Sequence, residues 1–408
     1  MSLHDLVVAY SALGVHRTGT AVDDATRSWF ATELERRGCA VDEAAYAFDR
    51  FDAEVTVTVH GREVDALPLW YSWQGDVDAT ITIAPGEGPP PSVVRAELTG
   101  IFTQGPLAAL RAGFAGSARS DGSRDRPPPE PADAAIVIAT LGGDSGIDAI
   151  IAPNRPLAAE GGPPTVLVAP SSISRASEIG VRGRAAIVAG ASATVVGRRG
   201  PESDDPLVVT TPLSGWFGCA AERGTGIAIA LHLLDVLPAS VPIVVVATTG
   251  HELEHEGLKR WLAGPTAAEL RPRAIVHLGA SVAAVESSQH GPELAASRFA
   301  FLRCPDSAPV SGEPDITELP ATSPSTGVAA ALESGRFLVV REPADWLGEG
   351  RQWSALGVPL LSLVGSFSRF HTAFDVPFMS TDPALLDFVA RHVADATAAL
   401  LAVVSGAG

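Results

Sequence analysis

The sequence predicts an α/β fold, in which a mixed sheet is sandwiched by helices and a β-rich accessory unit is attached to it. Two observations carry this prediction. From residue 206 onward, short and continuously apolar runs alternate with helical segments, which is typical of strands covered on both faces. Between residues 53 and 84, by contrast, apolar and polar residues alternate with a period of two, which is typical of half-exposed antiparallel strands.

The chain begins with two segments of helical spacing. Residues 3–13 carry one apolar stripe and residues 29–38 carry another, and the polar segment 14–20 separates them. Asp23 or Asp24 is expected to cap the second helix, because a carboxylate can accept hydrogen bonds from the first free backbone N–H groups. Two helices are therefore expected before the first strand.

A change of composition marks the accessory unit. Residues 85–135 are rich in proline, glycine and serine, as loops and linkers are. Short apolar runs then follow at residues 134–139, 165–169, 185–189 and 193–196. We therefore predict a β-rich insert over residues 45–204, with residues 1–44 and 205–408 forming the main domain.

The main domain is expected to alternate strands and helices. The predicted strands are residues 207–211, 241–248, 274–278, 337–340 and 359–364, and the predicted helices are residues 224–237, 258–262 and 382–404. In open α/β sheets, ligands gather at the carboxyl ends of the strands. Candidate site residues should therefore follow strands directly.

Composition excludes several classes of partner. The formal charge of −18, from 47 acidic and 29 basic residues, argues against nucleic acid and anionic membranes, which need a basic surface. The sequence has no apolar run of about 18 residues, so no membrane helix is expected, and no secretory signal is recognisable. The three cysteines lie far apart, as free thiols in the cytoplasm would. A small-molecule or short-peptide substrate is expected, and a homo-oligomer remains open.

The segment 241–257 can be interpreted as either of two kinds of site. The first interpretation is the HExxH pattern of zincins, which is matched by His251, Glu252 and His255. That pattern requires a helix, so that both histidines share one face. The preceding residues are β-branched and end at Gly250, which favours a strand over a helix. Glu269 is the only nearby candidate for a third ligand. The sequence therefore favours a loop at the end of a strand.

The second interpretation comes from five segments that occur in order along the chain. Together they resemble the M28 family of zinc peptidases, of the aminopeptidase Y and glutaminyl cyclase type. The segments are His16-Arg-Thr-Gly-Thr20, the β-rich region 45–204 (similar to a protease-associated insert), Gly218-Cys-Ala-Ala-Glu-Arg-Gly-Thr-Gly226, Gly250-His-Glu-Leu-Glu-His-Glu-Gly257, and Gly357-Val-Pro359 with Phe370-His-Thr-Ala-Phe-Asp375. The resemblance implies a zinc-exopeptidase architecture and chemistry on a peptide or amide bond.

Position by position, the resemblance implies a reduced metal centre. Glu222 falls at the family's bridging aspartate, Glu252 at its metal-binding glutamate and His371 at its last histidine ligand. Two further ligands are missing, because Thr211 and Gly279 stand near their places. The resemblance therefore implies one Zn²⁺ or similar divalent ion on Glu222, Glu252 and His371.

The family's general base is a glutamate, and His251 takes its place. An unperturbed imidazole pKa near 6.5 suits proton transfer near neutrality. We therefore expect an M28-like hydrolase that acts on an amide, peptide or related C–N bond. Three alternatives remain: a metal-independent lyase, cyclase or isomerase using His251 and Glu252, a site that has lost its metal, and a non-catalytic binding protein.

Five further residues are candidates for substrate binding. Glu349 lies where the family often has an acidic pocket residue, and Arg351 could pair with a substrate carboxylate. Trp216, Trp353 and Phe370 could wall an apolar pocket. The alternative for the aromatic residues is ordinary core or rim packing, and for Arg351 it is a surface salt bridge.

Overall fold

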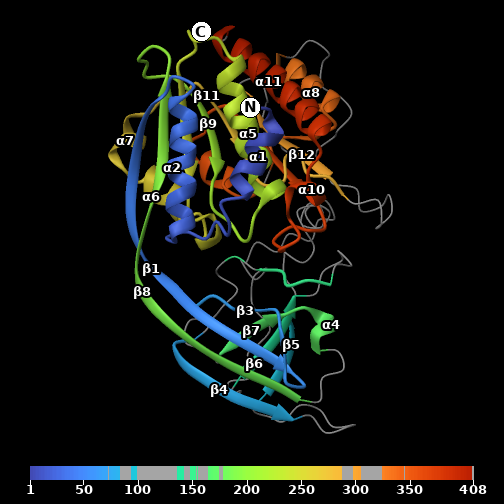
Figure 1. Cartoon of the computed structure of the whole chain (residues 1–408). Helices are drawn as coiled ribbons and strands as arrows, with labels where there is room; N and C mark the ends of the chain where they lie inside the picture. The colour runs from blue at the N-terminus through green and yellow to red at the C-terminus, as the bar shows by residue number, and fades with distance from the viewer. Residues whose placement is uncertain are drawn as a thin grey trace.

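The computed structural model in Figure 1 has a helix-covered main body, and a smaller body rich in strands is attached to it. Both chain termini lie in the main body. The structure describes residues 1–71, 73–82, 93–98, 136–141, 148–152, 154, 164–173, 178–286, 297–304, 324–343 and 345–406.

The main sheet is mixed and confirms the predicted α/β class. In the described part its order is β13-β12-β14-β11-β9-β10-β8-β1-β2, with β4 also paired to β8. Strands β10, β9, β11 and β14 are mutually parallel and form its centre. The bounds are β1 Ala40–Val59, β2 Arg62–Val64, β4 Gly75–Thr82, β8 Glu178–Arg199, β9 Leu207–Pro212, β10 Ile243–Thr248, β11 Ala274–Leu278, β12 Ser297–Arg303, β13 Leu338–Arg341 and β14 Leu360–Ser366.

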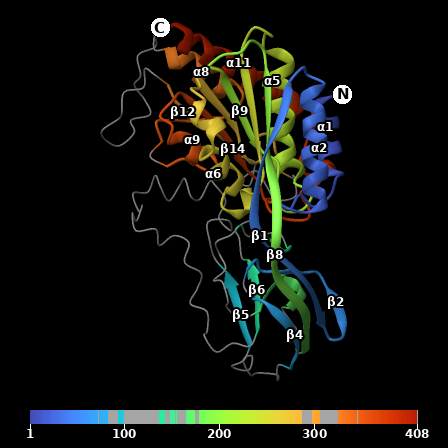
Figure 2. The same ribbon diagram turned by 90° about the vertical axis from the view of Figure 1, so that its left-hand side faces the viewer.

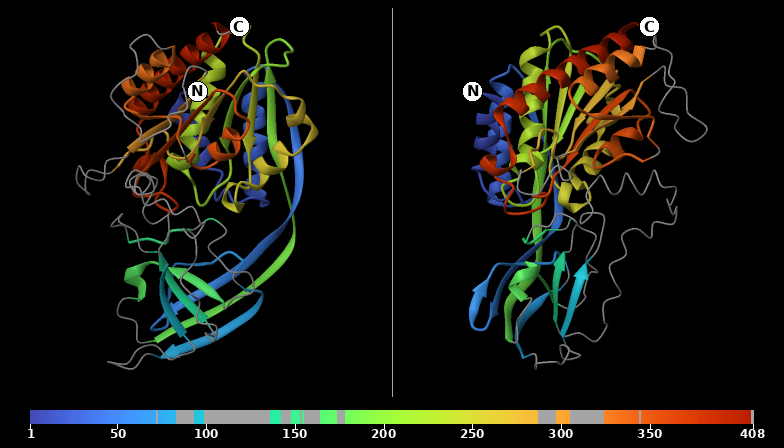
Figure 3. Two further views of the ribbon diagram at one scale, coloured as in Figure 1. Left: turned by 180° about the vertical axis from the view of Figure 1, so that it is seen from behind. Right: turned by 90° about the vertical axis from the view of Figure 1, so that its right-hand side faces the viewer.

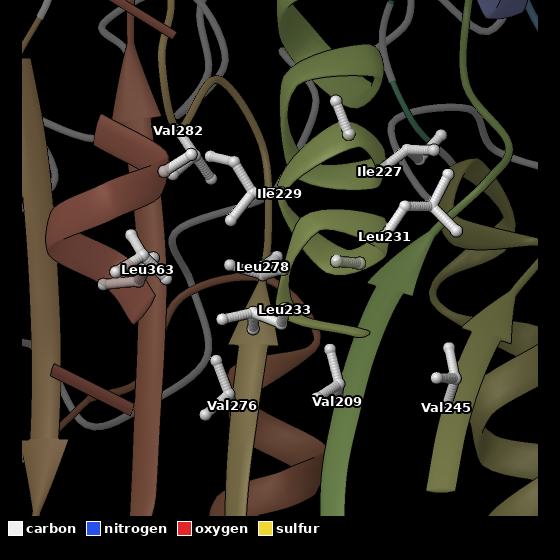
Figure 4. Packing of buried hydrophobic residues seen from close by; sticks show 14 of the residues in the cluster. Val209, Ile227, Ile229, Leu231, Leu233, Val245, Val276, Leu278, Val282 and Leu363 are labelled. Carbon is white, nitrogen blue, oxygen red and sulfur yellow. The ribbon is translucent and has the colours of Figure 1, made fainter. Parts of the chain in front are cut away.

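Helices cover both faces of this sheet, which explains why its central strands are apolar throughout. Alternate residues of one strand point to opposite faces, so Val209 joins the cluster under α5 while Val208 joins the cluster under α6 and α9. Figure 4 shows Val276 and Val209 of two strands near Leu233 of α5, with Val245 on a third strand farther from it. The helices are α1 Leu3–Ser11, α2 Ala21–Glu35, α5 Thr225–Val236, α6 Glu256–Leu262, α7 Pro265–Glu269, α8 Pro324–Ser334, α9 Gly350–Ser354, α10 Pro377–Ser380 and α11 Pro383–Gly406.

Of the helices that the structure describes, α11 alone is long and apolar enough to cross a bilayer. Its packing accounts for that composition. Leu386, Val389, Val393 and Leu400 are fully buried in the main core, and α11 contacts α8, α5 and α1. The apolar stripe of α11 therefore belongs to the core of the main body.

A two-stranded ribbon connects the two bodies. β1 pairs with β8 antiparallel over its whole length, from Ala40 opposite Arg198 to Val59 opposite Ile179. Figures 2 and 3 show both strands leaving the main sheet and continuing into the smaller body. The predicted strands 185–189 and 193–196 are thus one strand, because the small and polar residues between them pair with β1 without interruption.

The smaller body is a second layered structure. A four-stranded sheet runs in the order β3-β7-β6-β5, with bounds β3 Ala66–Pro68, β7 Thr165–Val168, β6 Ile136–Leu141 and β5 Val93–Leu98, and with the short helix α4 Pro170–Ile173 beside it. Val166 and Val168 of β7 pack with Val57 of β1 and Val181 of β8. The far ends of the ribbon therefore form one layer and the four-stranded sheet forms the other.

The two predicted N-terminal helices are confirmed as α1 and α2, but the predicted cap of α2 was wrong. Thr20 is the cap residue, and its hydroxyl accepts a hydrogen bond from the Asp23 backbone N–H. The Asp23 side chain instead accepts hydrogen bonds from the backbone N–H of Gly19 at 2.8 Å and from the Ser192 hydroxyl at 2.6 Å. Asp23 thus ties the N-terminal loop to β8, and burial raises its pKa to about 6.

Candidate active site at the carboxyl ends of the central strands

The predicted site residues gather where the parallel strands end. Glu222 follows β9, His251 and Glu252 follow β10, and His371 follows β14. These strands run parallel to one another, so their carboxyl ends share one edge of the sheet. The four side chains are buried there, and His251 retains 8% exposure.

The loop after β10 is a sequence of tight turns. Gly250 has φ +73°, His251–Leu253 form one 3₁₀ turn, and Glu254 and His255 have φ +59° and +65°. No α-helix runs through residues 251–255, so the side chains of His251 and His255 are not arranged on one helical face. The zincin interpretation, which requires that helix, is therefore excluded.

Gly257 fixes this loop against the end of β10. Its N–H donates to the Thr249 carbonyl at 3.1 Å, and an added Cβ would lie 2.2 Å from that same oxygen. We expect Gly257→Ala to lower the free energy of unfolding by about 1–3 kcal/mol and to displace the loop that carries His251. Gly327→Ala in α8 is the control, since nothing lies within 4 Å of its added Cβ. Equal urea midpoints for the two variants would contradict this account.

Glu252 is held by hydrogen bonds to both of its carboxylate oxygens. The Thr18 backbone N–H donates to Oε1 at 2.7 Å, and the Ser214 hydroxyl donates to Oε2 at 2.7 Å. The Thr18 hydroxyl in turn accepts from the Gly250 N–H at 2.8 Å. Glu252 therefore connects the N-terminal loop, the end of β9 and the end of β10.

His251 forms a hydrogen-bonded chain with Glu349 and Thr248. Nδ1 of His251 lies 3.2 Å from Oε1 of Glu349. The Thr248 hydroxyl lies 2.9 and 2.8 Å from the two oxygens of the same carboxylate. Because a carboxylate oxygen accepts, Nδ1 carries the proton and Nε2 keeps its lone pair. Burial and then the positive charge of Arg223 hold the pKa of His251 well below its usual range, so the ring is a neutral base at physiological pH.

The Glu222 carboxylate lies between the Arg223 guanidinium and the His371 imidazole. Its Oε1 is 2.9 Å from Nη2 of Arg223 and 3.3 Å from Nε2 of His371. Burial opposes ionisation of Glu222, but the charges of His371 and Arg223 outweigh it and lower its pKa to about 2. The carboxylate is therefore ionised and paired.

Asp375 holds the turn that presents Glu222 and Arg223. That turn, η2 Ala220–Gly224, is a π-helical turn before α5. The two oxygens of Asp375 accept from the backbone N–H groups of Ala221 and Glu222 at 2.8 and 2.9 Å. Burial raises the pKa of Asp375 to about 7. The aspartate is the last residue of the Phe370–Asp375 motif, but the sequence analysis assigned it no role.

His371 links the site to the smaller body. Its Nδ1 donates to the Ala152 carbonyl at 2.7 Å, and the Ala152 N–H donates to the His371 carbonyl at 3.0 Å. The Phe370 ring stacks on the imidazole with centroids 4.0 Å apart. The ring's Nε2 is thereby directed at Glu222.

The remaining substrate-binding candidates have varied surroundings. Trp353 is fully buried and packs on Trp261 with ring centroids 5.6 Å apart, so it belongs to the core rather than to a pocket wall. Trp216 packs edge-on against Trp70 at 4.4 Å, and its indole N–H donates to Asn154 at 3.2 Å. Arg351 is exposed on α9. The described contacts of Glu349 are to His251 and Thr248, so it orients the histidine.

A cavity of about 560 Å³ lies beside the His251 loop. Tyr71 and Trp73 of the smaller body line it together with Leu253 and Glu254 of the loop. Leu253 also packs in an aromatic cluster with Phe51, Trp70, Tyr71, Trp73 and Trp216. The loop that carries His251 is therefore in contact with both bodies.

Solved structures share the fold of this protein over nearly the whole chain. A zinc aminopeptidase from Bacillus subtilis is 16% identical, with a TM-score of 0.64 over 97% of this chain and 93% of its own. A peptidase M28 precursor from Shewanella amazonensis is 17% identical, with a TM-score of 0.66 over 98% and 92%. The aminopeptidase from Aneurinibacillus sp. strain AM-1 is 15% identical, with a TM-score of 0.56 over 98% and 93%.

The chain has the M28 aminopeptidase fold. The fold-level prediction is thereby confirmed. No family model matches the sequence, and no curated protein matches it. At such low identity the M28 fold leaves the chemistry to be argued from the site itself.

A zinc aminopeptidase shares this fold, so the side chains at the strand ends are candidate ligands for a metal ion. Among the residues that the structure describes, no three His, Cys, Asp or Glu side chains form a group that could hold a metal ion. Each oxygen of Glu252 already accepts one hydrogen bond, from Thr18 or Ser214. Oε1 of Glu222 accepts none in the described structure, but the guanidinium of Arg223 lies 2.9 Å from it. The predicted set Glu222, Glu252 and His371 therefore does not fit a zinc ion in this arrangement.

Arg223 is the site residue that sequence analysis missed. A basic residue directly after an acidic one usually forms a solvated ion pair, so this pair of residues did not by itself indicate a buried site residue. The signal was its position, because Arg223 stands between the apolar residues 219–221 and the apolar helix α5. A charge inside such a segment has to be buried and paired.

Proposed function

We propose that the protein is a hydrolase that cleaves an amide, peptide or related C–N bond in a small substrate, with His251 as its general base. The observation that carries this proposal is the chain of contacts from Thr248 through Glu349 to Nδ1 of His251. The aminopeptidase neighbours support the class of bond.

In the proposed reaction, Nε2 of His251 takes a proton from water as the water oxygen bonds to the substrate's carbonyl carbon. The carbonyl π electrons move onto oxygen, which gives a tetrahedral intermediate. As the carbonyl re-forms, the C–N bond breaks and His251 returns the proton to the leaving nitrogen. The products are a carboxylic acid and an amine, and the balance requires only water. Glu349 keeps the imidazole in the tautomer that this cycle needs.

The surroundings support a small substrate. Phe370 and Arg351 are our proposed substrate contacts, since Phe370 is half-buried beside His371 and Arg351 is exposed near the Glu349 turn. The ordered contact between His371 and Ala152 brings the smaller body to the same edge of the sheet. A short peptide or an aminoacyl amide is the expected size.

An assay in ¹⁸O-labelled water tests the proposal. The purified protein is incubated with a panel of aminoacyl amides, aminoacyl anilides and dipeptides, and products are identified by mass spectrometry. We expect release of the amine with one ¹⁸O atom in the new carboxylate. Turnover without ¹⁸O incorporation would contradict hydrolysis and favour a lyase or cyclase, and a protein that binds panel members without turnover would be a non-catalytic binding protein.

A further inference from the structure

We infer that the guanidinium of Arg223 is the resident cation of this centre, and that it balances the charge of Glu222 in place of a divalent metal ion. The inference concerns how the site is held together and does not depend on which bond the protein cleaves. Burial, contacts, available space and charge each support it.

Arg223 is the most deeply buried arginine in the described structure. It is 1% exposed and Glu222 is 0% exposed. Its Nη2 lies 2.9 Å from Oε1 of Glu222, and its Nε donates to the Ser214 carbonyl at 2.9 Å. A buried guanidinium requires a paired anion, and Glu222 is that anion.

The guanidinium spans the ends of two elements that a metal would have to bridge. Ser214 follows β9, where the missing first ligand would have stood, and Glu222 lies on the turn before α5. Neither Nη1 nor Nη2 of Arg223 has a hydrogen-bond partner within the described part of the chain. The cation is therefore hydrogen-bonded through Nε to Ser214, paired with Glu222 by charge, and keeps unused donor capacity inside a buried site.

Little space remains beside this ion pair. An added Cβ at Gly215 would lie 3.0 Å from Sγ of Cys219, 3.3 Å from Nε of Arg223 and 3.4 Å from Oε1 of Glu222. The backbone thus packs closely on the pair, and a side chain at Gly215 would require Cys219 or the pair to move by a few tenths of an ångström. A metal ion with its own water ligands would have to displace the guanidinium.

Electrostatics point the same way. Like charges disfavour each other strongly when both are buried, so a divalent cation next to Oε1 of Glu222 would be repelled by Arg223. The positive charge already reaches the catalytic histidine, because it helps burial to lower the pKa of His251. Arg223 thereby exerts on its neighbours the effect that a bound cation would exert.

Zinc binding measured on five proteins tests the inference. They are the wild-type protein, Arg223→Met, Arg223→Lys, Glu222→Gln and the control Arg303→Met, which removes a half-buried guanidinium on β12 that contacts Glu342 and Ser354. Each is dialysed against a low micromolar concentration of Zn²⁺, and bound metal is measured by plasma mass spectrometry. Thermal unfolding is recorded with and without Zn²⁺.

In the wild-type protein, Arg223→Lys and Arg303→Met, we expect less than one equivalent of bound zinc. Addition of Zn²⁺ should leave the melting temperature of each of these proteins unchanged. Arg223→Met should melt several degrees lower than the wild-type protein because Glu222 keeps only His371 beside it, and Zn²⁺ should raise its melting temperature by taking the place of the guanidinium. One equivalent of zinc in the wild-type protein that is lost in Glu222→Gln would overturn the inference. So would an Arg223→Met variant as stable as the wild-type protein.

If Arg223→Met does not fold, that is the expected result of removing the guanidinium from beside the buried Glu222, and the wild-type, Arg223→Lys and Glu222→Gln measurements still decide. None of these measurements uses turnover, so absence of hydrolase activity would leave the inference standing. Zinc bound through Glu222 in an active wild-type protein would leave the proposed hydrolase standing and remove only the inference.

Discussion

Replacing His251 with alanine is expected to lower kcat by about 10²–10⁴-fold, which is the usual contribution of a positioned general base. The fold should be retained, because the backbone turns of this loop are set by Gly250 and Gly257 and the imidazole contributes one hydrogen bond to Glu349. Steady-state kinetics on the best substrate from the amide panel would measure the loss.

His255→Ala is the matched control. The His255 ring lies 4.6 Å from that of His251 in the same loop, but its Nδ1 is bonded to Gln352 at 3.0 Å, so its loss should change kcat much less. Glu349→Gln should lower kcat with little change in KM, since it disturbs the orientation of His251 without removing it. Full turnover in His251→Ala would remove the histidine from the mechanism.

Lowering the pH below about 6.5 is expected to destabilise the protein steeply, because several buried histidines stay neutral in the fold. Burial lowers the pKa of His16 and of His255 to about 3, and that of His277 to about 4, and it moves the pKa of His251 in the same direction. In the unfolded chain these imidazoles accept protons near pH 6.5, whereas the folded protein does not. Their contribution is therefore present above pH 6.5 and is lost as the pH falls toward 3.

Two aspartates oppose this effect over part of the same range. Burial raises the pKa of Asp23 to about 6 and that of Asp375 to about 7, so near pH 5 the folded protein holds two protons that the unfolded chain has released. Four histidines against two aspartates leave a net uptake of about two protons on unfolding. Each proton corresponds to about 1.4 kcal/mol per pH unit, so the free energy of unfolding should fall by about 3 kcal/mol per unit near pH 5.

Urea unfolding between pH 7.5 and 4.5 measures this slope. His277→Gln should reduce it by about one proton, because His277 is fully buried and its Nδ1 bonds only the Ser362 hydroxyl, at 2.8 Å, in the described structure. His60→Gln in the exposed turn after β1 is the control and should leave it unchanged. A free energy of unfolding that stays level or rises from pH 6.5 to 4.5 would contradict the buried neutral histidines.

Much of the fold was predictable because local pattern and tertiary packing agree in it. The apolar run 241–248 became the central strand β10, and the two N-terminal stripes became α1 and α2. The unity of β8 was not predictable, since residues 190–192 are small or polar and only their pairing with β1 keeps them in a strand. A pairing partner far along the chain leaves no periodic signal at either strand.

The location of the site could be predicted from the sequence, but the hydrogen-bond partners of its side chains could not. Strand ends located Glu222, His251, Glu252 and His371 at one edge of the sheet. Which groups face each carboxylate depends on loops that are distant in sequence: Thr18 and Ser214 engage Glu252, and Glu349 reaches His251. The predicted zinc ligand set assumed that the Glu252 carboxylate makes no hydrogen bonds within the protein. Its bonds to Thr18 and Ser214 involve residues distant in sequence and could not be predicted.

The ribbon of β1 and β8 has a consequence for how the protein folds. β8 stands between β1 and β10, so the main sheet is incomplete until β8 arrives. Residues 60–177, which include β2 to β7, lie between the two strands along the chain. Closing so long a loop is entropically costly and slow, and a compact smaller body shortens the distance its ends must travel. Destabilising the smaller body should therefore slow refolding of the main sheet, including the strand ends that position His251.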